Sequence, residues 1–527
     1  MLHALKAHLT KPRRSVAWPL GLAVLIVGAG VLGPLAYLVL RAFEGDWSSV
    51  QALVFRPRNA LLLGRTVGLT AAVLGLGLVL ALPLAWLTTR TTFARYRWIT
   101  LVGVLPLAIP SYVLAYILLA ATGSYGVLAQ ALGLEVPRPS GFVGAWLALS
   151  FYTFPYLFLN LRAALLGLDA SLEESAQALG YSPWSVFGRV IMPQLRPAVA
   201  AGSLIVALHV LGDFGVVSLM RFETFSYAIY LQYSAAFDRV YAAWLALMLV
   251  GLTAMVLLVE ARFLRGITLH SNKAGHHRPP RRHRLGAWRS PAFGFIGGLA
   301  LLSFVLPLVT LVYWLAQSLP SVSVLGAALW GSISVAIPSA VGASLVALPL
   351  TYYSVRRPSA LTYAAERVAY LGYAMPPLSF ALAMIFLTLT AWPAWYQSIG
   401  ILLFAYIMHY LAEAIGPIRS ALYQAPPRLE EAARSLGYRP FQAFARVTLP
   451  LLQRGMAVSA AFVFLAVMKE LPLTFLLAPA GFESLALRVW SYANEALFDR
   501  AAPFALLLLM FSALFVGLLL TTRETER

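Results

Sequence analysis

The chain alternates long apolar runs with short polar stretches. Each run is long enough to cross the roughly 30 Å hydrocarbon core of a bilayer as a helix that rises about 1.5 Å per residue. The sequence therefore predicts an all-α membrane protein with twelve transmembrane helices, six on each side of a basic stretch. The runs lie at about 17–40, 62–88, 98–122, 142–162, 197–218, 241–264, 292–317, 326–354, 368–391, 398–418, 455–478 and 501–522.

One polar stretch between the apolar runs occurs twice. ESAQALGYSPWSVFGRVIMP (174–193) and EAARSLGYRPFQAFARVTLP (431–450) are identical at ten of their twenty positions. We call residues 171–193 the first polar segment and residues 427–450 the second polar segment. Shorter matches accompany them, Leu82-Pro83-Leu84 with Leu348-Pro349-Leu350 and Ile109-Pro110 with Met375-Pro376.

These matches divide the chain into a first repeat (1–265), a basic linker (266–291) and a second repeat (292–527). Each repeat holds six predicted membrane helices and so begins and ends on the same side of the membrane. The two repeats are therefore expected to be parallel, related by an axis along the membrane normal.

Each polar segment predicts a helix, a tight turn and a second helix. In the first segment, Ser171 and Glu174 have capping-box spacing, and Gly180 suits a left-handed C-cap. Ser182-Pro183 then offers an N-cap followed by proline. Because Pro193 disfavours helix in the residue before it, the second helix should end near residue 191. The second segment repeats this pattern with Pro427, Glu431, Gly437 and Pro440.

Aromatic side chains recur around the turn and along the second helix. Spacings of three to four residues place Trp184, Phe187 and Ile191 on one side. An apolar face of this kind outside the membrane favours a docking surface, and the alternative is that it packs beneath its own membrane helices. The duplicated positions are Tyr181/Tyr438, Trp184/Phe441, Phe187/Phe444, Arg189/Arg446 and Val190/Val447.

Composition supports an integral membrane protein. Of the 527 residues, 60% are hydrophobic and 11% charged, whereas soluble domains carry roughly 25% charged residues. No cysteine is present, which excludes disulfides, thiolate metal sites and a cysteine nucleophile. The formal charge of +19 is explained by topology without a nucleic-acid partner, since a cytoplasmic N-terminus places 29 basic residues inside and 8 outside. Both termini are thus expected in the cytoplasm, with the linker held near anionic lipid.

The duplicated segments carry a family resemblance. Glu431-Ala432-Ala433, Gly437 and Leu449-Pro450 resemble the signature of binding-protein-dependent ABC importer permeases, and the first copy departs mildly at Ser175 and Met192. In that family the segments dock as coupling helices on cytoplasmic ATPase subunits. Residues implied to couple are Glu174, Ala176, Gly180, Tyr181, Pro183, Trp184, Phe187, Arg189, Pro193, Glu431, Ala432, Ala433, Gly437, Tyr438, Pro440, Phe441, Phe444, Arg446 and Pro450.

The resemblance implies a fused permease of the type I ABC importer kind, a multi-pass protein of the bacterial cytoplasmic (inner) membrane. Its implied partners are two ATPase subunits, which bind ATP and Mg, and a periplasmic or extracellular solute-binding protein. The chain itself is expected to bind no cofactor or metal. Residues 211–218, 221–225, 469–474 and 485–490 resemble ferric-iron importer permeases, but thiamine and phosphonate permeases share the six-plus-six plan.

Two carboxylates occupy equivalent places in predicted membrane runs, Asp213 and Glu470. Ionisable groups in a bilayer usually face the bundle interior or water, so these two are candidates for the translocation pathway of a hard cation. The alternative is a structural role, as the cap of a broken helix or a partner of Lys469. Gly215 and Pro472 lie beside them and should interrupt the helices there, as at transporter gates.

Two other classes of protein compete with this interpretation: a membrane scaffold or enzyme, which no catalytic constellation in the sequence supports, and a secondary transporter. The chain has no GxxxxGK(S/T) phosphate loop, because no lysine follows a glycine, so it is not expected to be an enzyme that hydrolyses ATP. A major-facilitator-type secondary transporter also has six plus six helices. Nothing in that class explains a duplicated helix-turn-helix. In addition, TTRTTFARYR (88–97) does not match the acidic-basic Gly-rich motif of that class.

Overall fold

The structure is a computed structural model that describes residues 18–44, 47–236, 238–263, 282–318 and 320–522. These residues are almost entirely helical, and no strand longer than a single β-bridge occurs among them. The predicted all-α class is confirmed. Most of the linker and the basic N-terminus fall outside the described residues.

Within the described residues, eight helices are long and apolar enough to cross a membrane, or up to eleven if each of three bent pairs counts as one span. The predicted number of twelve is therefore not confirmed. The eight are Trp18–Ala42, Pro57–Arg90, Gly141–Gly167, Trp184–Gly212, Arg239–Phe263, Gly286–Gln317, Val322–Arg356 and Pro440–Met468. The twelfth predicted run is helical (α28, Phe498–Thr522) but is not among these spans.

Three runs predicted as single membrane helices are bent. Arg97–Ala108 and Ser111–Ala121 meet at 97°, Ala360–Ala374 and Pro377–Ala391 at 107°, and Ile399–His409 and Leu411–Gln424 at 50°. The first two bends fall at Ile109-Pro110 and Met375-Pro376, the pair already matched between the repeats. Ile109 (ψ 119°) and Met375 (ψ 133°) are extended, the conformation that a following proline favours.

A π-helical turn joins each polar segment to the membrane helix that follows. Phe187–Ile191 and Phe444–Thr448 are π turns, and α12 (Met192–Gly212) and α25 (Leu449–Met468) continue from them without a break. The expected helix end near residue 191 is wrong. A π turn hydrogen-bonds five residues back and has locally shifted geometry, so Pro193 and Pro450 are accommodated at the second position of the α-helix that resumes.

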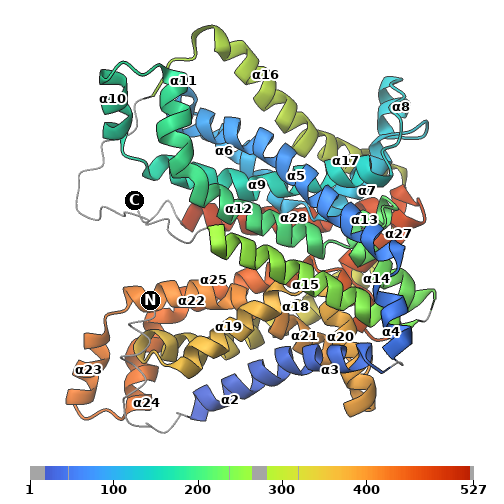
Figure 1. The fold of residues 1–527 in the computed structure, drawn as a ribbon, viewed down its shortest axis with the longest axis vertical. Helices are drawn as coiled ribbons and strands as arrows, with labels where there is room; N and C mark the ends of the chain where they lie inside the picture. The colour runs from blue at the N-terminus through green and yellow to red at the C-terminus, as the bar shows by residue number, and fades with distance from the viewer. Residues whose placement is uncertain (1–17, 45–46, 237, 264–281, 319, 523–527) are drawn as a thin grey trace. The chain divides into compact units, whose positions relative to one another are not determined.

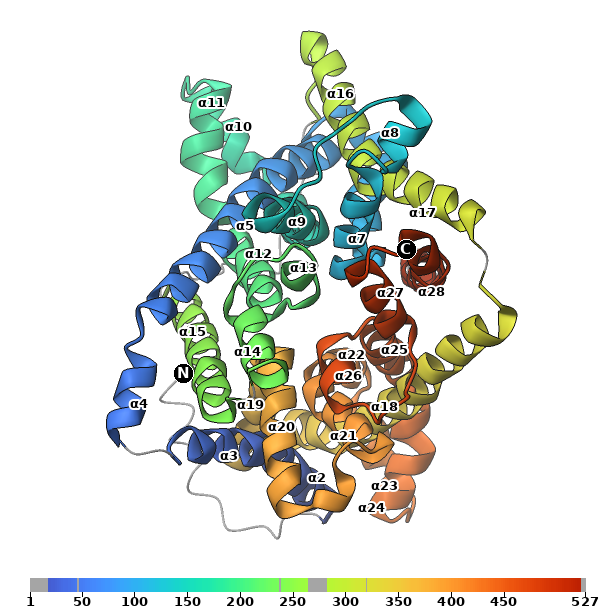
Figure 2. The same cartoon turned by 90° about the vertical axis from the view of Figure 1, so that its right-hand side faces the viewer.

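The described residues form two compact units that exchange segments between the repeats. Unit 2 combines residues 55–228 of the first repeat with 248–320 and 489–527. Its core is α5 (Pro57–Arg90), packed against α9 (Gly141–Gly167) and α12. The second repeat's α17 (Leu306–Gln317) lies against α7 (Ser111–Ala121) and α28 (Figure 2).

Unit 1 is built in the same way from residues 1–54, 229–247 and 321–488. Here α18 (Val322–Arg356) packs against α22 (Leu411–Gln424) and α25, which repeats the core of unit 2. The first repeat contributes α2 (Trp18–Val27), which packs on α18, and α3 (Gly33–Ala42), which packs on α20 (Pro377–Ala391) (Figure 1). Each unit is thus completed by helices from the other repeat.

Candidate functional site

The first polar segment folds as a helix, a glycine turn and a second helix. Asp169 precedes α10 (Ala170–Ala178), and its side chain accepts a hydrogen bond from the amide of Ser171 at 3.0 Å. The predicted Ser171–Glu174 capping box is therefore wrong, because Asp169 already occupies the cap. Gly180 has φ +84° and closes α10, and the hydroxyl of Ser182 accepts from the amide of Ser185 at 3.3 Å.

The second polar segment has the same backbone. α23 (Pro427–Ser435) is followed by a turn at Gly437, whose φ is +91°. The amide of Tyr438 donates to the carbonyl of Ala433 at 3.2 Å. The first segment has the matching bond from Tyr181 to Ala176, also 3.2 Å. A left-handed residue of this kind favours glycine, so both turns depend on it. α11 (Pro183–Val186) and α24 (Pro440–Ala443), both labelled in Figure 1, follow and run on through the π turns into the membrane helices.

The predicted apolar face is divided between solvent and the unit's own core. Trp184 is 83% exposed and Phe441 is 77% exposed. Phe187, by contrast, packs edge-on against Trp86 at 5.4 Å, and Phe444 packs against Tyr352 at 5.1 Å. The outward surface therefore consists of the turn and the start of the second helix, and Phe187 and Ile191 do not belong to it.

The other predicted coupling residues have similar surroundings in the two polar segments. Glu174, Glu431 and Ala432 are exposed, and Ala176 and Ala433 are buried. The guanidinium of Arg189 lies 5.7 Å from the ring centre of Tyr181, and that of Arg446 lies 5.1 Å from the ring centre of Tyr438. These cation–π contacts tie each turn to the π-helical stretch that follows it.

A buried ion pair anchors the first polar segment. Arg90, at the end of α5, is fully buried and pairs with Glu173 of α10 at 2.8 Å, while it donates to the carbonyl of Leu165 at 3.0 Å. Burial raises the pKa of the Glu173 carboxyl, and the charges of Arg90 and His283 oppose that rise. His283 is held by a β-bridge to Thr91 and stacks on Trp86. The end of the linker region therefore lies against this anchor.

Hydroxyl groups anchor the second polar segment at the equivalent place. Glu430 of α23 accepts from the phenol of Tyr352 at 2.6 Å and from the hydroxyl of Thr448 at 2.9 Å. Arg356, the counterpart of Arg90, donates to the carbonyl of Ala425 at 2.6 Å. The two acidic residues differ by 257 positions and the two arginines by 266, which are the offsets of the matched motifs. That coincidence was the signal by which the anchors could have been found.

Asp213 lies at a break between two helices. α12 ends at Gly212, and α13 (Gly215–Leu219) begins after it. The Asp213 carboxylate accepts from the amide of Val216 at 2.8 Å and from the hydroxyl of Ser111 at 2.6 Å. It thus caps the restarted helix and links it to the start of α7.

Glu470 lies at the corresponding break in the second repeat. α25 ends at Met468, and α26 (Pro472–Leu477) follows. The Glu470 carboxylate accepts from the amide of Leu473 at 3.1 Å and from the phenol of Tyr410. Both helices break beside Gly215 and Pro472, where the sequence predicts a break. The carboxylates have the capping geometry of the structural alternative, while their part in a translocation pathway stays a prediction.

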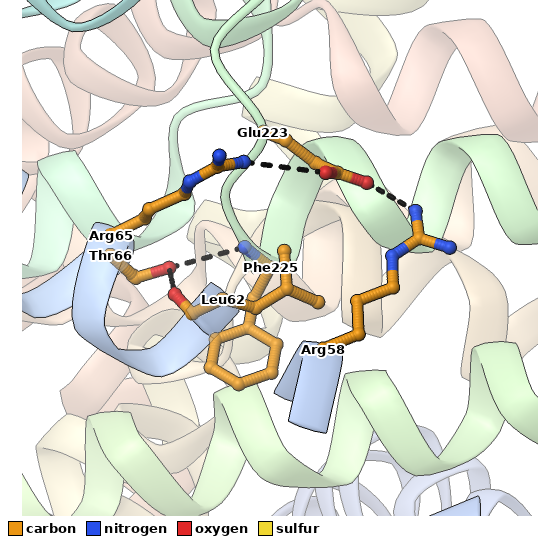
Figure 3. Close-up of polar contacts among 6 residues, drawn as sticks. All are labelled: Arg58, Leu62, Arg65, Thr66, Glu223 and Phe225. Carbon is orange, nitrogen blue, oxygen red and sulfur yellow. Dashed lines mark hydrogen bonds and ion pairs between the residues drawn. The ribbon is translucent and has the colours of Figure 1, made fainter. Parts of the chain in front are cut away.

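A loop at the other end of α5 is also duplicated. The amide of Phe225 donates to the hydroxyl of Thr66 at 3.2 Å (Figure 3), and the amide of Leu485 donates to the hydroxyl of Ser332 at 2.9 Å. Four residues before these amides stand Arg221 (φ +53°) and Gly481 (φ +79°), both left-handed. The two repeats therefore build this loop on one scaffold.

Comparison with known proteins identifies the family. Residues 73–268 and 341–523 each match the model of the binding-protein-dependent transport system inner membrane component. The chain belongs to this family. Its two matches contain the two polar segments, and its apolar helices make it a multi-pass membrane protein.

Individual relatives differ in how much of this chain they match. The Fe(3+)-transport system permease protein FbpB 2 of Haemophilus influenzae is 33% identical over 514 residues, which cover 96% of this chain and 99% of the relative. The molybdenum transport system permease protein ModB of Escherichia coli is 32% identical over 157 residues, 29% of this chain and 69% of the relative. The probable sulfate transport system permease protein cysT of Nephroselmis olivacea is 28% identical over 217 residues, 40% of this chain and 75% of the relative.

Proposed function

We propose that the chain is the fused permease of an ATP-driven importer of ferric iron, which a solute-binding protein delivers. The observation that carries this proposal is the match to the iron permease of Haemophilus influenzae along nearly the full length of both chains. The molybdenum and sulfate permeases match a smaller part of this chain. Thiamine and phosphonate import remain the alternatives that share the six-plus-six plan.

Each polar segment acts as a seat for one ATPase subunit, so a single chain binds two. An exposed aromatic residue beside a rigid glycine turn suits a groove on a partner, as Trp184 and Phe441 do. Because α12 and α25 continue from the segments, a displacement of either seat moves a membrane helix directly. ATP and Mg bind to the ATPase subunits, which carry out hydrolysis, and the chain contributes the passage and its gates.

The gates lie at the broken helices that carry Asp213 and Glu470. Capping holds each restarted helix in place, and the breaks give the helices points about which they can bend. A carboxylate oxygen is also a suitable ligand for a hard cation such as ferric iron during its passage. The polar segments then face the cytoplasm, as do both termini.

Reconstitution tests the proposal. The chain, its ATPase and the iron-loaded solute-binding protein are combined in proteoliposomes, and ATP-dependent accumulation of radioactive iron is measured. We expect uptake that requires all three proteins, with no uptake of molybdate, thiamine or phosphonate. Uptake by the chain alone, driven by an ion gradient, would instead identify a secondary transporter and overturn the proposal.

A further inference from the structure

The end of α5 away from the first polar segment carries a group of basic residues. Arg58 and Arg65 lie near the start of this 34-residue helix, and Arg90 lies at its end. A helix of this length extends about 50 Å, so the two ends lie on opposite sides of a bilayer. Under the proposed function, Arg90 lies on the ATPase side and Arg58 on the side from which substrate arrives.

Glu223 holds two of these arginines in place (Figure 3). One carboxylate oxygen pairs with Arg58, and the other lies 3.4 Å from a guanidinium nitrogen of Arg65. The two arginine side chains are still 42% and 39% exposed. Each guanidinium has five N–H donors, and Glu223 engages one nitrogen of each, so further donors point away from it.

Two more exposed arginines flank this pair in sequence. Arg56 immediately precedes α5, and Arg221 stands two residues before Glu223. We call Arg56, Arg58, Arg65 and Arg221 the arginine cluster. Four arginines against one glutamate leave a formal charge of +3. Basic residues are disfavoured on the outer side of a membrane protein, so their concentration here requires a specific cause.

The loop before Phe225 does not need these arginines to fold, because the second repeat builds the same loop without arginines at the equivalent positions. Glu483 is the counterpart of Glu223, and Ser332 holds the loop as Thr66 does. A Cβ at Gly331, the counterpart of Arg65, would lie 1.9 Å from the carbonyl oxygen of Glu483, so no side chain fits there. The residues at the four cluster positions are Val322, Val324, Gly331 and Gly481.

We infer that the arginine cluster is the docking site for an acidic surface of the solute-binding protein, and that its restriction to one repeat sets the orientation in which that protein docks. This inference rests on the proposed function. Guanidinium forks bind carboxylates bidentately, and Glu223 positions two of them before the partner arrives. Arg65 also lies over Phe222, 6.0 Å from the ring centre, which restrains its side chain.

The charge acts mainly on the rate of association. A basic patch attracts an acidic partner over about a Debye length, and charges at the rim of an interface change the association rate and its salt dependence more than the dissociation rate. The four arginines of the cluster lie in only one repeat, and Arg488 of the other repeat is already paired with Glu483, so an approaching acidic lobe is drawn to the side of the first repeat. The partner therefore arrives already oriented.

The test measures association of the iron-loaded solute-binding protein with the permease–ATPase complex in nanodiscs. The double variant Arg58→Gln/Arg65→Gln should associate about 10-fold more slowly at low salt, and the difference should shrink at high salt. Arg58→Lys/Arg65→Lys retains the charge and should stay near the wild-type rate. Glu223→Gln leaves the arginines and adds net positive charge, so its association rate should equal or exceed that of wild type, and the lost positioning of the guanidinium groups should show only as faster dissociation.

The matched control is Arg488→Gln, which removes the arginine paired with Glu483 in the second repeat. It should alter the rate by less than about twofold if docking charge is confined to the first repeat. An equal effect of the control, an unchanged rate in the double glutamine variant, or a loss in Glu223→Gln would overturn the inference.

Two further measurements separate this inference from the proposed function. If the wild-type complex imports iron with its binding protein and the double glutamine variant associates normally, the inference fails and the function stands. If the wild-type complex imports no iron, the proposed function fails first. Uptake of ferric citrate without the binding protein, lost in the same variant, would show that the cluster attracts an anionic chelate, and the inference would be wrong.

Discussion

In the first polar segment the acidic residue before the turn meets a buried guanidinium, and in the second it meets two hydroxyl groups. The pairs are Glu173 with Arg90, and Glu430 with Tyr352 and Thr448. The backbones nevertheless agree, with left-handed glycines at φ +84° and +91° and a π turn in each. The repeats have thus kept the geometry that presents the turn, while the contacts that fasten it have diverged.

Replacing Arg90 or Arg356 should give the largest difference in stability between the two anchors. Arg90→Met leaves Glu173 buried without its guanidinium and should lower the free energy of unfolding by about 3–5 kcal/mol. Arg356→Met should cost about 1 kcal/mol, since Glu430 keeps both hydroxyl partners. Thermal unfolding of the purified protein measures both. Adding Glu173→Gln to Arg90→Met should restore part of the loss, and equal losses in the two arginine variants would contradict the difference between the anchors.

Truncation of the exposed aromatic residues should affect binding without affecting stability. Trp184→Ala and Phe441→Ala should each weaken ATPase binding by about 2 kcal/mol, or roughly 30-fold in Kd. The larger indole should make the first effect the greater. Titration with the purified ATPase measures the affinity, and thermal unfolding serves as the control. Phe187→Ala should lower thermal stability and leave ATPase affinity unchanged, because Phe187 packs on Trp86. Unchanged affinity in both exposed variants would mean that these turns are not the seats.

Branched side chains at the two glycines should affect both segments equally. Gly180→Val and Gly437→Val force a left-handed conformation that costs about 1–2 kcal/mol for a non-glycine residue. Each should reduce co-purification of the ATPase, and the double variant should abolish it. Gly188→Ala is the matched control, since Gly188 has open space and the second repeat has Ala445 there. A defect in only one single variant would show that the two seats are not equivalent.

The smallest expected change in stability follows the loss of the Tyr352 hydroxyl. Tyr352→Phe removes the phenol that donates to Glu430 but keeps the ring on Phe444, so it should lower stability by about 1 kcal/mol. Trp86→Phe, at the equivalent place, removes no phenol hydroxyl and tests the ring contacts with Phe187 and His283. Thermal unfolding compares the two variants. A loss in Tyr352→Phe as large as that in Arg90→Met would mean that the hydroxyl anchor matches the ionic one.

Local rules accounted for the turns and the helix breaks. Glycine and proline restrict the backbone whatever surrounds them, so the turns at Gly180 and Gly437 and the breaks beside Gly215 and Pro472 follow from the sequence. The bends at Pro110 and Pro376 do not, because residues 98–122 and 368–391 are each expected to form one membrane helix. The continuation of the helix past Pro193 did not follow, because a π turn depends on hydrogen bonds that periodicity does not reveal. The cap at Asp169 does not stand out in the sequence, because Ser171 offers a competing cap two residues later.

Contacts between distant residues were harder to predict. Arg90 and Glu173 are 83 positions apart, and neither stands out until α5 and α10 are brought together. The same holds for Glu223 with Arg58 and Arg65. Apolar periodicity identifies which residues avoid water, but it does not specify which helix meets which. For Arg90 and Glu173, the offsets of 266 and 257 between the repeats are the available guide.

The exchange of helices between the repeats has a consequence for assembly. Neither repeat, expressed alone, has all the helices that complete a unit, because α2 and α3 pack in unit 1 and α16 (Arg289–Ala300) and α17 belong to unit 2. Two separate polypeptides would have to find each other in the bilayer before either unit had all of its helices. In one chain the connection turns that encounter into an intramolecular step at high effective concentration. Fusion thus fixes a one-to-one pairing of unlike halves and prevents either half from pairing with a copy of itself.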